Sequence, residues 1–334
     1  MKKNLIFIVT LLTAGAILLS SCGAPSAQPT KAATAPIKVA LLTYGLVTGD
    51  PWNALGYAGL NKAKETLGVE TALTDNLDTP DFEAALRDYA SQNYNLVIGH
   101  SFGFGDPAVA VAKDFPNTFF VINTGAVSAA NVASINVQDQ ENGYLTGALA
   151  AMVTKTGTIG ILGGFDYPSV IKEINGYYDG AKAINPDIKV LVGYVGSWDD
   201  PAKAQELAQA MISQGADVLS HKAGGSGLGV IKAAEVAGVW AINDVATCQE
   251  TSPTACLTST DIKFDNIVIN TIQLYQQGKL EGKIYSWGIK DGAADIGPIN
   301  SKVPADIVNK IMDLRQQIID GKLVIPEKWD PGWQ

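Results

Sequence analysis

The sequence predicts two similar α/β lobes, each a parallel β-sheet wrapped by helices. Short β-branched runs alternate with helical patterns along the chain, which is typical of strands joined by crossover helices. The expected strands are residues 37–43, 95–100, 118–123, 158–163, 189–194, 217–221 and 239–242. The expected helices, with apolar residues at three- and four-residue spacing, are residues 55–66, 81–92, 202–214 and 229–237.

The order of these features repeats in the two halves of the chain. In each half a strand leads to a similar sequence, GYAGLNKAK at residues 56–64 and GYYDGAKAI at residues 176–184. Each half then has a helix opened by Asp and Pro, a Ser-Gln end of that helix, and a strand ending in His before a glycine-rich loop. His100 and His221 occupy the matching positions. Because these coincidences come in one order, they indicate two lobes built on one plan.

The N-terminal residues predict export and a lipid anchor. Lys2 and Lys3 precede an apolar run over residues 5–19, which is the order of a secretory signal and too short for the ~20 residues of a membrane span. Leu-Ser-Ser-Cys22 resembles the lipobox of bacterial lipoproteins, so residues 1–21 are the expected signal peptide and Cys22 the expected acylated, palmitate-bearing N-terminus. Ordinary secretion with an incidental Cys22 is the alternative.

Residues 22–36 contain no large apolar side chain and are expected to form a disordered tether. No later run is long and apolar enough to span a bilayer, so we expect a domain anchored to the extracytoplasmic face of the cell membrane by lipid alone. The formal charge is −9 and becomes −11 without Lys2 and Lys3. An acidic chain without a basic cluster repels phosphate backbones, so nucleic acid is not an expected partner.

The mature domain has two cysteines, Cys248 and Cys256. In an exported protein such a close pair can form a disulfide, and two buried thiols are the alternative. Neither a metal site nor a cofactor is expected, since no His lies near these cysteines and no cluster of His, Cys and carboxylates occurs elsewhere in the sequence.

Ligands of open parallel sheets bind beyond the carboxyl ends of the strands. Two facing lobes would therefore pool their strand-end loops in one cleft, which a hinge can close. These loops are residues 44–53, 101–106, 164–167, 196–199, 222–227 and 243–245. Phe104 is a candidate ligand contact in the second of them.

The strand-end loops contain no catalytic constellation. His100 and His221 are the only histidines, and neither lies in a Gly-x-Ser-x-Gly elbow or a His-Glu-x-x-His helix. The glycine loop at residues 224–229 opens a helix but lacks the Gly-x-Gly-x-x-Gly and Gly-Lys-Ser/Thr patterns of nucleotide-binding loops. A tight turn close to the ligand explains these glycines better than phosphate binding. We therefore expect a binding protein and not an enzyme.

Two aromatic residues suggest what is bound. Trp52 and Trp198 lie in polar, turn-forming loops, one in each lobe, and could stack on both faces of a flat ring. Core packing is the alternative for each of them. Asp50 and Asn53 could add hydrogen bonds to the ligand, or they could cap the following helix.

The mature chain resembles the basic membrane protein family, whose best-understood members are purine nucleoside receptors of ABC importers. The matching motifs are DPWN at residues 50–53, GYVGSWDDPAK at 193–203, QGADV at 214–218, AGGSGLGV at 223–230 and GIKDG at 288–292. This resemblance implies stacking by Trp52 and Trp198, a ligand beside Gly225, and a ribose contact by an acidic residue, for which Asp244 is the candidate.

The sequence departs from the nucleoside receptors at two positions. Tyr44 stands where they tend to have an Asp, and a Lys expected near residue 262 is displaced to Lys263 or missing. Tyr44 fits a second branch of the family, some of whose members bind a free purine base. Free-base or other planar ligands, and a receptor that feeds a signalling system, are therefore alternatives to nucleoside import.

The resemblance also implies a type I periplasmic-binding-protein fold, a monomer with ABC permease partners, and three chain crossings between the lobes. The regions expected to cross are residues 142–156, 246–257 and 285–298. Lobe 1 is expected to comprise residues 37–149 and 257–283, and lobe 2 residues 150–256 and 284–334.

Overall fold

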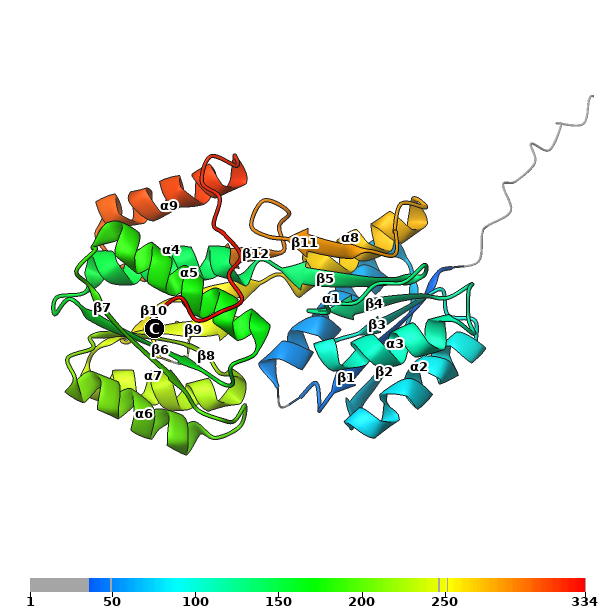
Figure 1. Cartoon of the computed structure of the whole chain (residues 1–334), viewed down its shortest axis with the longest axis horizontal. Helices are drawn as coiled ribbons and strands as arrows, with labels where there is room; N and C mark the ends of the chain where they lie inside the picture. The colour runs from blue at the N-terminus through cyan, green and yellow to red at the C-terminus, as the bar shows by residue number, and fades with distance from the viewer. Residues whose placement is uncertain (1–35, 49, 246, 251, 334) are drawn as a thin grey trace, which may run out of the picture. The chain divides into compact units, whose positions relative to one another are not determined.

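The computed structural model describes residues 36–48, 50–245, 247–250 and 252–333. The predicted signal peptide, Cys22 and nearly all of the predicted tether lie outside the described residues. Within them, strands and helices alternate along the chain and build two sheets (Figure 1). None of the described helices is both long and apolar enough to cross a membrane.

The first sheet, which defines lobe 1, is parallel throughout and has the strand order β11-β5-β4-β3-β1-β2. Its strands are β1 (Lys38–Tyr44), β2 (Glu70–Leu77), β3 (Leu96–Gly99), β4 (Phe119–Asn123), β5 (Val132–Val137) and β11 (Ile284–Trp287). Its helices are α1 (Pro51–Leu67), α2 (Phe82–Ser91), α3 (Gly105–Ala112) and α8 (Phe264–Gln276), with 3₁₀ turns η1 (Thr79–Asp81) and η2 (Phe102–Phe104).

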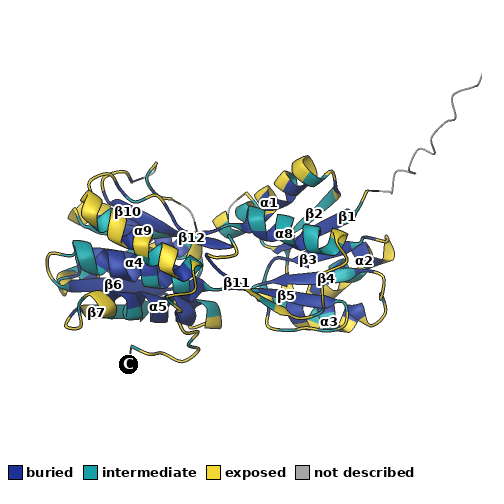
Figure 2. Ribbon diagram, turned by 90° about the horizontal axis from the view of Figure 1, so that it is seen from above, coloured by how far each residue is buried: buried dark blue, intermediate teal, exposed yellow. Residues whose placement is uncertain are grey.

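Helices cover both faces of this sheet, which explains why β1 is a continuous apolar run. Val39 and Leu41 pack with residues of α1 and α8, whereas Ala40 and Leu42 pack with residues of α2 and α3. A parallel strand buried on both faces needs apolar residues at successive positions. The inner strands of both sheets are accordingly buried, edge strands such as β2 and β11 are only partly so, and the outward sides of the helices are exposed (Figure 2).

The second sheet defines lobe 2 and has the order β12-β10-β9-β8-β6-β7, in which only β12 runs antiparallel to its neighbour. Its strands are β6 (Thr158–Gly163), β7 (Lys189–Tyr194), β8 (Val218–Lys222), β9 (Trp240–Val245), β10 (Cys256–Ile262) and β12 (Ala294–Ile296). Its helices are α4 (Asp139–Val153), α5 (Pro168–Ile184), α6 (Pro201–Ser213), α7 (Gly227–Ala237) and α9 (Ala305–Ile319), with the 3₁₀ turn η3 (Gly224–Ser226).

In the described residues, the chain passes between the two lobes three times. It does so between β5 and α4, between β10 and α8, and between β11 and β12. The lobe boundaries expected from the sequence run differently. Helix α4 packs on α5 of lobe 2, β10 pairs with β9, and β11 pairs with β5. Each of these three elements is placed by its contacts with another helix or strand, which local periodicity does not encode, so all three lie in the other lobe than expected.

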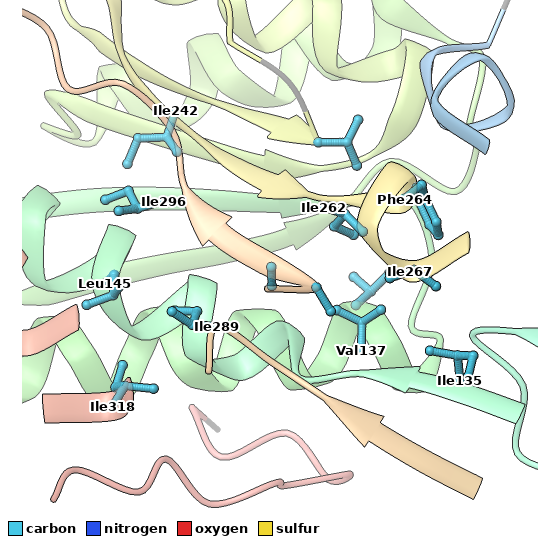
Figure 3. Packing of buried hydrophobic residues seen from close by; sticks show 14 of the residues in the cluster. Ile135, Val137, Leu145, Ile242, Ile262, Phe264, Ile267, Ile289, Ile296 and Ile318 are labelled. Atoms are coloured by element: carbon cyan, nitrogen blue, oxygen red, sulfur yellow. The ribbon is translucent and has the colours of Figure 1, made fainter. Parts of the chain in front are cut away.

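The apolar core continues through these passages. One cluster includes Val137 before the first passage, Ile262 and Phe264 on either side of the second, and Ile289 in the third. The same cluster contains Ile135 of lobe 1, together with residues of lobe 2 such as Leu145 and Ile318 (Figure 3).

Helices α4 and α5 pack unusually closely because glycines face the backbone of the partner helix. A Cβ on Gly147 would lie 2.0 Å from the Tyr177 carbonyl oxygen, and one on Gly176 would lie 2.2 Å from the Gln140 carbonyl oxygen. Gly143 and Gly180 make equally close approaches. This contact brings the first turn of α4 and the second turn of α5 together at the carboxyl end of the second sheet.

Candidate ligand-binding site

The loop after β1 is shaped by Asp50, which caps α1. The Asp50 carboxylate accepts hydrogen bonds from the backbone N–H groups of Trp52 and Asn53, at 2.8 and 3.4 Å. Burial raises the pKa of Asp50, these two hydrogen bonds lower it, and the carboxylates of Asp244 and Asp199 raise it further. Asp50 of lobe 1 therefore lies within electrostatic range of two carboxylates of lobe 2.

Asn53 ties the start of α1 to the end of β1. It is 1% exposed, and its Nδ2 donates to the Tyr44 carbonyl oxygen at 2.6 Å. Its Oδ1 is buried and has no hydrogen-bond partner in the structure. The Tyr44 side chain, by contrast, is 50% exposed. Tyr44 is thus free to meet a ligand, whereas Asn53 chiefly holds the loop.

Trp52 is half-buried against a framework of aromatic rings. It packs edge to face with Phe264, at a centroid distance of 4.6 Å, and its ring centroid lies 5.3 Å from that of His100. His100 is fully buried, and Asn123 Nδ2 lies 2.8 Å from His100 Nδ1. An amide nitrogen can only donate, so His100 Nδ1 accepts and the ring proton sits on Nε2. Burial lowers the pKa of His100 to about 4, which keeps the ring neutral.

Trp198 belongs to an aromatic group in lobe 2 that also contains Phe165 and Tyr167. The Trp198 ring centroid lies 5.4 Å from that of Phe165 and 6.0 Å from that of Tyr167. The ring also lies directly on Gly164, where a Cβ would come within 2.4 Å of it. A side chain at residue 164 would thus displace Trp198, which explains this glycine.

Lobe 1 adds a fourth ring to this group. Phe102 of η2 is 58% exposed and meets Tyr167 edge to face, with ring centroids 5.4 Å apart. We call Phe102, Phe165, Tyr167 and Trp198 the aromatic group. It joins strand-end loops of both lobes, residues 101–106, 164–167 and 196–199, which the sequence predicts to face the ligand, although Trp198 is the one member predicted there by name.

Phe104 does not join this surface. It is fully buried and stacks on Phe82, with ring centroids 3.8 Å apart. The η2 turn points Phe102 outward and Phe104 into the core. Phe102, and not the predicted Phe104, is therefore the exposed aromatic residue of this turn. Only the packing partner Phe82, 22 positions earlier, distinguishes them.

The glycine loop supports the Trp198 loop by hydrogen bonds. The Ser226 N–H donates to the Trp198 carbonyl oxygen at 3.0 Å, and Ser226 Oγ donates to the Ser197 carbonyl oxygen at 3.0 Å. Gly225 lies beside the Trp198 carbonyl, since a Cβ there would be 3.3 Å from that oxygen. Gly225 therefore lies close to the loop that carries Trp198.

Asp244 and Lys263 occupy different surroundings. Asp244 is 8% exposed near the end of β9 and lies opposite Thr260 of β10, whose Oγ1 donates to Asp244 Oδ1 at 3.4 Å. Lys263 follows β10 in the second passage between the lobes, and its Nζ pairs with Asp261 Oδ2 at 2.7 Å. Lys263 thus already has a carboxylate partner.

A buried charge cluster, not anticipated from the sequence, lies behind Asp244. Lys222 Nζ contacts Asp139 Oδ1 at 2.9 Å and Glu173 Oε2 at 2.6 Å, and Asp139 Oδ2 lies 3.7 Å from Lys172 Nζ. All four side chains are almost completely buried. Lys222, Asp139 and Glu173 are far apart in the sequence, so no local motif predicts the cluster.

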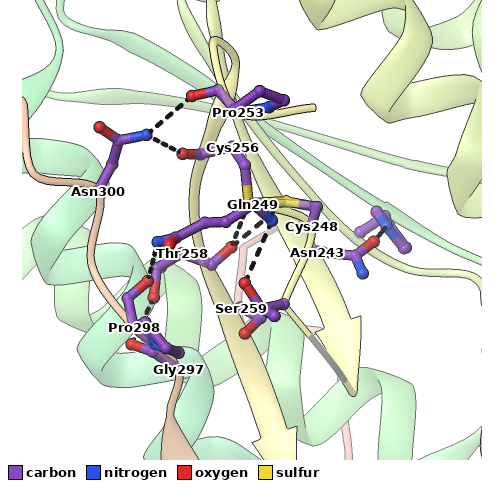
Figure 4. Close-up of a disulfide and its surroundings, with 12 residues drawn as sticks. Asn243, Cys248, Gln249, Pro253, Cys256, Thr258, Ser259, Gly297, Pro298 and Asn300 are labelled. Carbon is purple, nitrogen blue, oxygen red and sulfur yellow. Dashed lines mark hydrogen bonds between the residues drawn. A yellow bond between two sulfur atoms is a disulfide. The ribbon is translucent and has the colours of Figure 1, made fainter. Parts of the chain in front are cut away.

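Cys248 and Cys256 form a disulfide that closes the loop between β9 and β10 (Figure 4). Asn300 Nδ2 fixes the same loop by donating to the carbonyl oxygens of Cys256 and Pro253, at 2.7 and 3.2 Å. The disulfide therefore anchors the start of β10 next to the strand that carries Asp244. In the described residues, no group of three or more His, Cys, Asp or Glu side chains is arranged to hold a metal ion.

Two α/β lobes linked by three passages, with strand-end loops brought together, define a solute-binding protein of the type I fold. The family model described as ABC transporter substrate-binding protein PnrA-like matches residues 37–328. The chain belongs to this family, which confirms the family inferred from the sequence motifs.

Several relatives cover most of the chain. The ABC transporter nucleoside-binding protein BmpA of Lactococcus lactis is 30% identical, covering 98% of this chain and all of that protein. A purine-binding protein of Brucella abortus is 29% identical, covering 78% of this chain and 74% of its own length. The transcriptional activator protein med of Bacillus subtilis is 29% identical, covering 94% of this chain and 96% of that protein.

Solved structures share the fold. A transcriptional activator of the comK gene from Bacillus halodurans superposes with a TM-score of 0.79 at 26% identity, over 86% of this chain and 100% of that one. An ABC transporter solute-binding protein from Aeropyrum pernix gives a TM-score of 0.76 at 22% identity, over 88% and 94% of the two chains. The predicted type I fold is confirmed.

Proposed function

We propose that this protein is an extracytoplasmic receptor of an ABC importer, and that it binds a purine nucleoside or a related planar heterocycle where the strand-end loops of the two lobes meet. Family membership supports the importer, and the relatives named as nucleoside-binding and purine-binding support the ligand class. The observation that carries the proposal is the aromatic group, which is partly exposed and lies in the loops after β3, β6 and β7.

The chemistry of these loops suits a flat, uncharged ligand. Stacking on an aromatic face is worth ~1–3 kcal/mol, and carboxylates accept hydrogen bonds from hydroxyl and amino groups. The carboxylates of Asp199 and Asp244 lie near enough to Asp50 to raise its pKa, so a phosphate would be repelled by this group of acidic residues. We therefore favour a nucleoside or a free base over a nucleotide.

The proposed ligand contacts follow from this chemistry. Trp52, Trp198 and Tyr44 would contact the ring, and Phe102, Phe165 and Tyr167 join them in place of Phe104. Asp244 and Asp50 would accept hydrogen bonds, while Asn53, Gly225 and Lys263 would shape the site. We propose binding without chemical conversion, by a monomer whose lobes close about the three passages and which delivers its ligand to permease subunits.

The anchor is a separate part of the proposal. Acylation at Cys22 would hold the domain at the outer face of the cell membrane. Mass spectrometry of the mature N-terminus tests this directly, because a lipid-modified Cys22 is expected. An unmodified N-terminus at another residue would refute the anchor and leave the ligand proposal intact.

Native mass spectrometry of the purified protein, followed by calorimetric titration with adenosine, guanosine, inosine and adenine, tests the ligand class. At least one of these compounds should bind, and adenosine monophosphate should bind at least tenfold more weakly than adenosine. Failure of all four to bind would overturn the ligand proposal.

A signalling receptor of the same fold is the second candidate, favoured by the relatives named transcriptional activators. The chain would then bind the same kind of ligand but report to a partner protein. Deletion of a neighbouring permease gene separates the two functions, since loss of ligand uptake is expected only for an importer receptor.

A further inference from the structure

The register of the second sheet places Lys222 beside Asp244. Ser220 of β8 lies opposite Ile242 of β9, so two residues further along, Lys222 and Asp244 are neighbours on the same face of the sheet. The contact of His221 Nε2 with Asn243 Oδ1, at 2.8 Å on the opposite face, shows that the register continues.

Lys222 also contacts the two helices that cover this face. Its Nζ donates to Asp139 Oδ1 at 2.9 Å, in the first turn of α4, and to Glu173 Oε2 at 2.6 Å, in α5. The close packing of α4 and α5 on their glycines holds these two carboxylates together. Lys222 thus contacts acidic residues of two helices and lies next to Asp244 in the sheet.

The first turn of α4 in turn touches the other passages between the lobes. Glu141 Oε2 accepts from the Ile289 N–H at 2.8 Å in the third passage, and Asn142 Nδ2 donates to the Asp261 carbonyl oxygen at 3.2 Å just before the second. A displacement of Lys222 would therefore be transmitted to the segments that connect the lobes.

Lys222 supplies a positive charge to this cluster of buried acidic side chains. Although burial opposes it, the carboxylates of Asp139, Glu173 and Asp244 raise the pKa of Lys222, so the amine remains charged. Burial raises the pKa of Glu173 to about 8, Lys222 works against this rise, and Asp244 and Asp139 add to it. Lys222 Nζ is the nearer amine to Asp139, at 2.9 Å, whereas Lys172 Nζ lies 3.7 Å from Asp139 and pairs more closely with Glu327, at 3.1 Å. Without Lys222, a buried carboxylate would be left without a counter-charge.

We propose that Lys222 is a positioning residue for ligand binding, which places its charge beside Asp244 in the sheet and ties this end of β8 to the first turn of α4 through Asp139. The inference rests on the proposed function, because it assigns Asp244 to the ligand. Lys222 itself is 5% exposed and acts through Asp244.

A double-mutant cycle tests this assignment with whichever of adenosine, guanosine, inosine or adenine binds the wild type most tightly. Lys222→Met and Asp244→Asn should each weaken binding at least tenfold. The double variant should bind no more weakly than the weaker single variant, because both changes act through the Asp244 carboxylate. Lys172→Met is the matched control, since it removes the other buried lysine near Asp139 and should leave affinity within twofold.

A second pair of variants covers the case in which Lys222→Met does not fold. Adding Glu173→Gln replaces the acidic side chain that lies 2.6 Å from Lys222 Nζ by a neutral amide, and the Lys222→Met/Glu173→Gln variant should bind at least tenfold more weakly than Glu173→Gln alone. Additive effects in the cycle, or a folded Lys222 variant within twofold of its parent, would overturn the inference. Absence of binding to the wild type would instead refute the ligand class.

Discussion

Trp52 and His100 hold each other through two reciprocal hydrogen bonds. The Trp52 Nε1–H donates to the His100 carbonyl oxygen at 3.2 Å, and the His100 Nε2–H donates to the Trp52 carbonyl oxygen at 3.0 Å. The pair joins the start of α1 to the end of β3, two places where a ligand of a parallel sheet would lie. Trp52 is therefore part of the framework as well as a candidate ligand contact.

The first prediction separates these two roles of Trp52. Trp52→Ala should lower the free energy of unfolding by about 3 kcal/mol, because it removes a large ring that is packed on His100 and Phe264. Trp52→Phe should cost less, about 1–2 kcal/mol, for the unsatisfied His100 carbonyl. Urea unfolding measures both. Equal urea midpoints for Trp52→Ala and wild type would show that the ring has no framework role.

The second prediction concerns the titration of His100. Burial lowers its pKa to about 4 from an unfolded value near 6.5, so the unfolded state binds more protons between these values. The stability that the neutral ring contributes is present above pH 6.5 and is lost as the pH falls toward 4. Urea midpoints of His100→Gln should therefore change less than those of wild type between pH 6.5 and 4.5. An identical slope in both proteins would contradict the assignment.

Sequence patterns predicted the parts of the fold that local chemistry determines. Strand residues 37–43 and helix residues 202–214 follow from a β-branched run and from helical periodicity, and β1 and α6 lie there. The place of β11 could not be predicted, because it is decided by pairing with the distant strand β5. The place of β10 depends on its pairing with β9, which the apolar pattern of β10 alone does not encode. The residues of the candidate site also divide into predictable and unpredictable ones. Trp198 could be predicted because it lies in a polar, turn-forming loop, whereas the exposure of Phe102 depends on the orientation of the η2 turn.

The third prediction tests the glycine contact between α4 and α5. Both helices carry a Gly-x-x-x-Gly spacing, at residues 143 and 147 in α4 and at residues 176 and 180 in α5. A Cβ at residue 176 would lie 2.2 Å from the Gln140 carbonyl oxygen, so Gly176→Ala should destabilise the fold by about 1–3 kcal/mol. The direction of the change is informative, because the higher helix propensity of alanine compared with glycine would by itself stabilise the helix. A rise in the unfolding midpoint would contradict the close contact.

The fourth prediction concerns Glu173. Burial raises its pKa to about 8, above the ordinary value of 4.5, so the folded state binds more protons between these values. Its contribution to stability is full below pH 4.5 and is lost as the pH rises through 8. The stability of wild type should therefore fall more steeply between pH 6 and 9 than that of Glu173→Gln. Chemical unfolding at these pH values measures the difference, and parallel curves would rule out a protonated Glu173.

The last prediction concerns the contact of Phe102 with Tyr167, which links the two lobes through the aromatic group. Because Phe102 is 58% exposed, Phe102→Ala should change the unfolding midpoint little. If the contact helps to hold the lobes closed over a ligand, the variant should release it about 2–10 times faster, which corresponds to the ~0.5–1.5 kcal/mol of an aromatic pair.

Stopped-flow tryptophan fluorescence, with the nucleoside or base that binds the wild type, measures this dissociation rate. Val236→Ala is the matched control, since Val236 is 69% exposed near the end of α7 and belongs to no strand-end loop. Tyr167→Ala should release the ligand at least as fast as Phe102→Ala, because it also removes the contacts of Tyr167 with Phe165 and Trp198. The double variant should release it no faster than Tyr167→Ala, because the contact of Phe102 with Tyr167 is already lost. Unchanged release from both single variants would show that the aromatic pair plays no part in retaining the ligand.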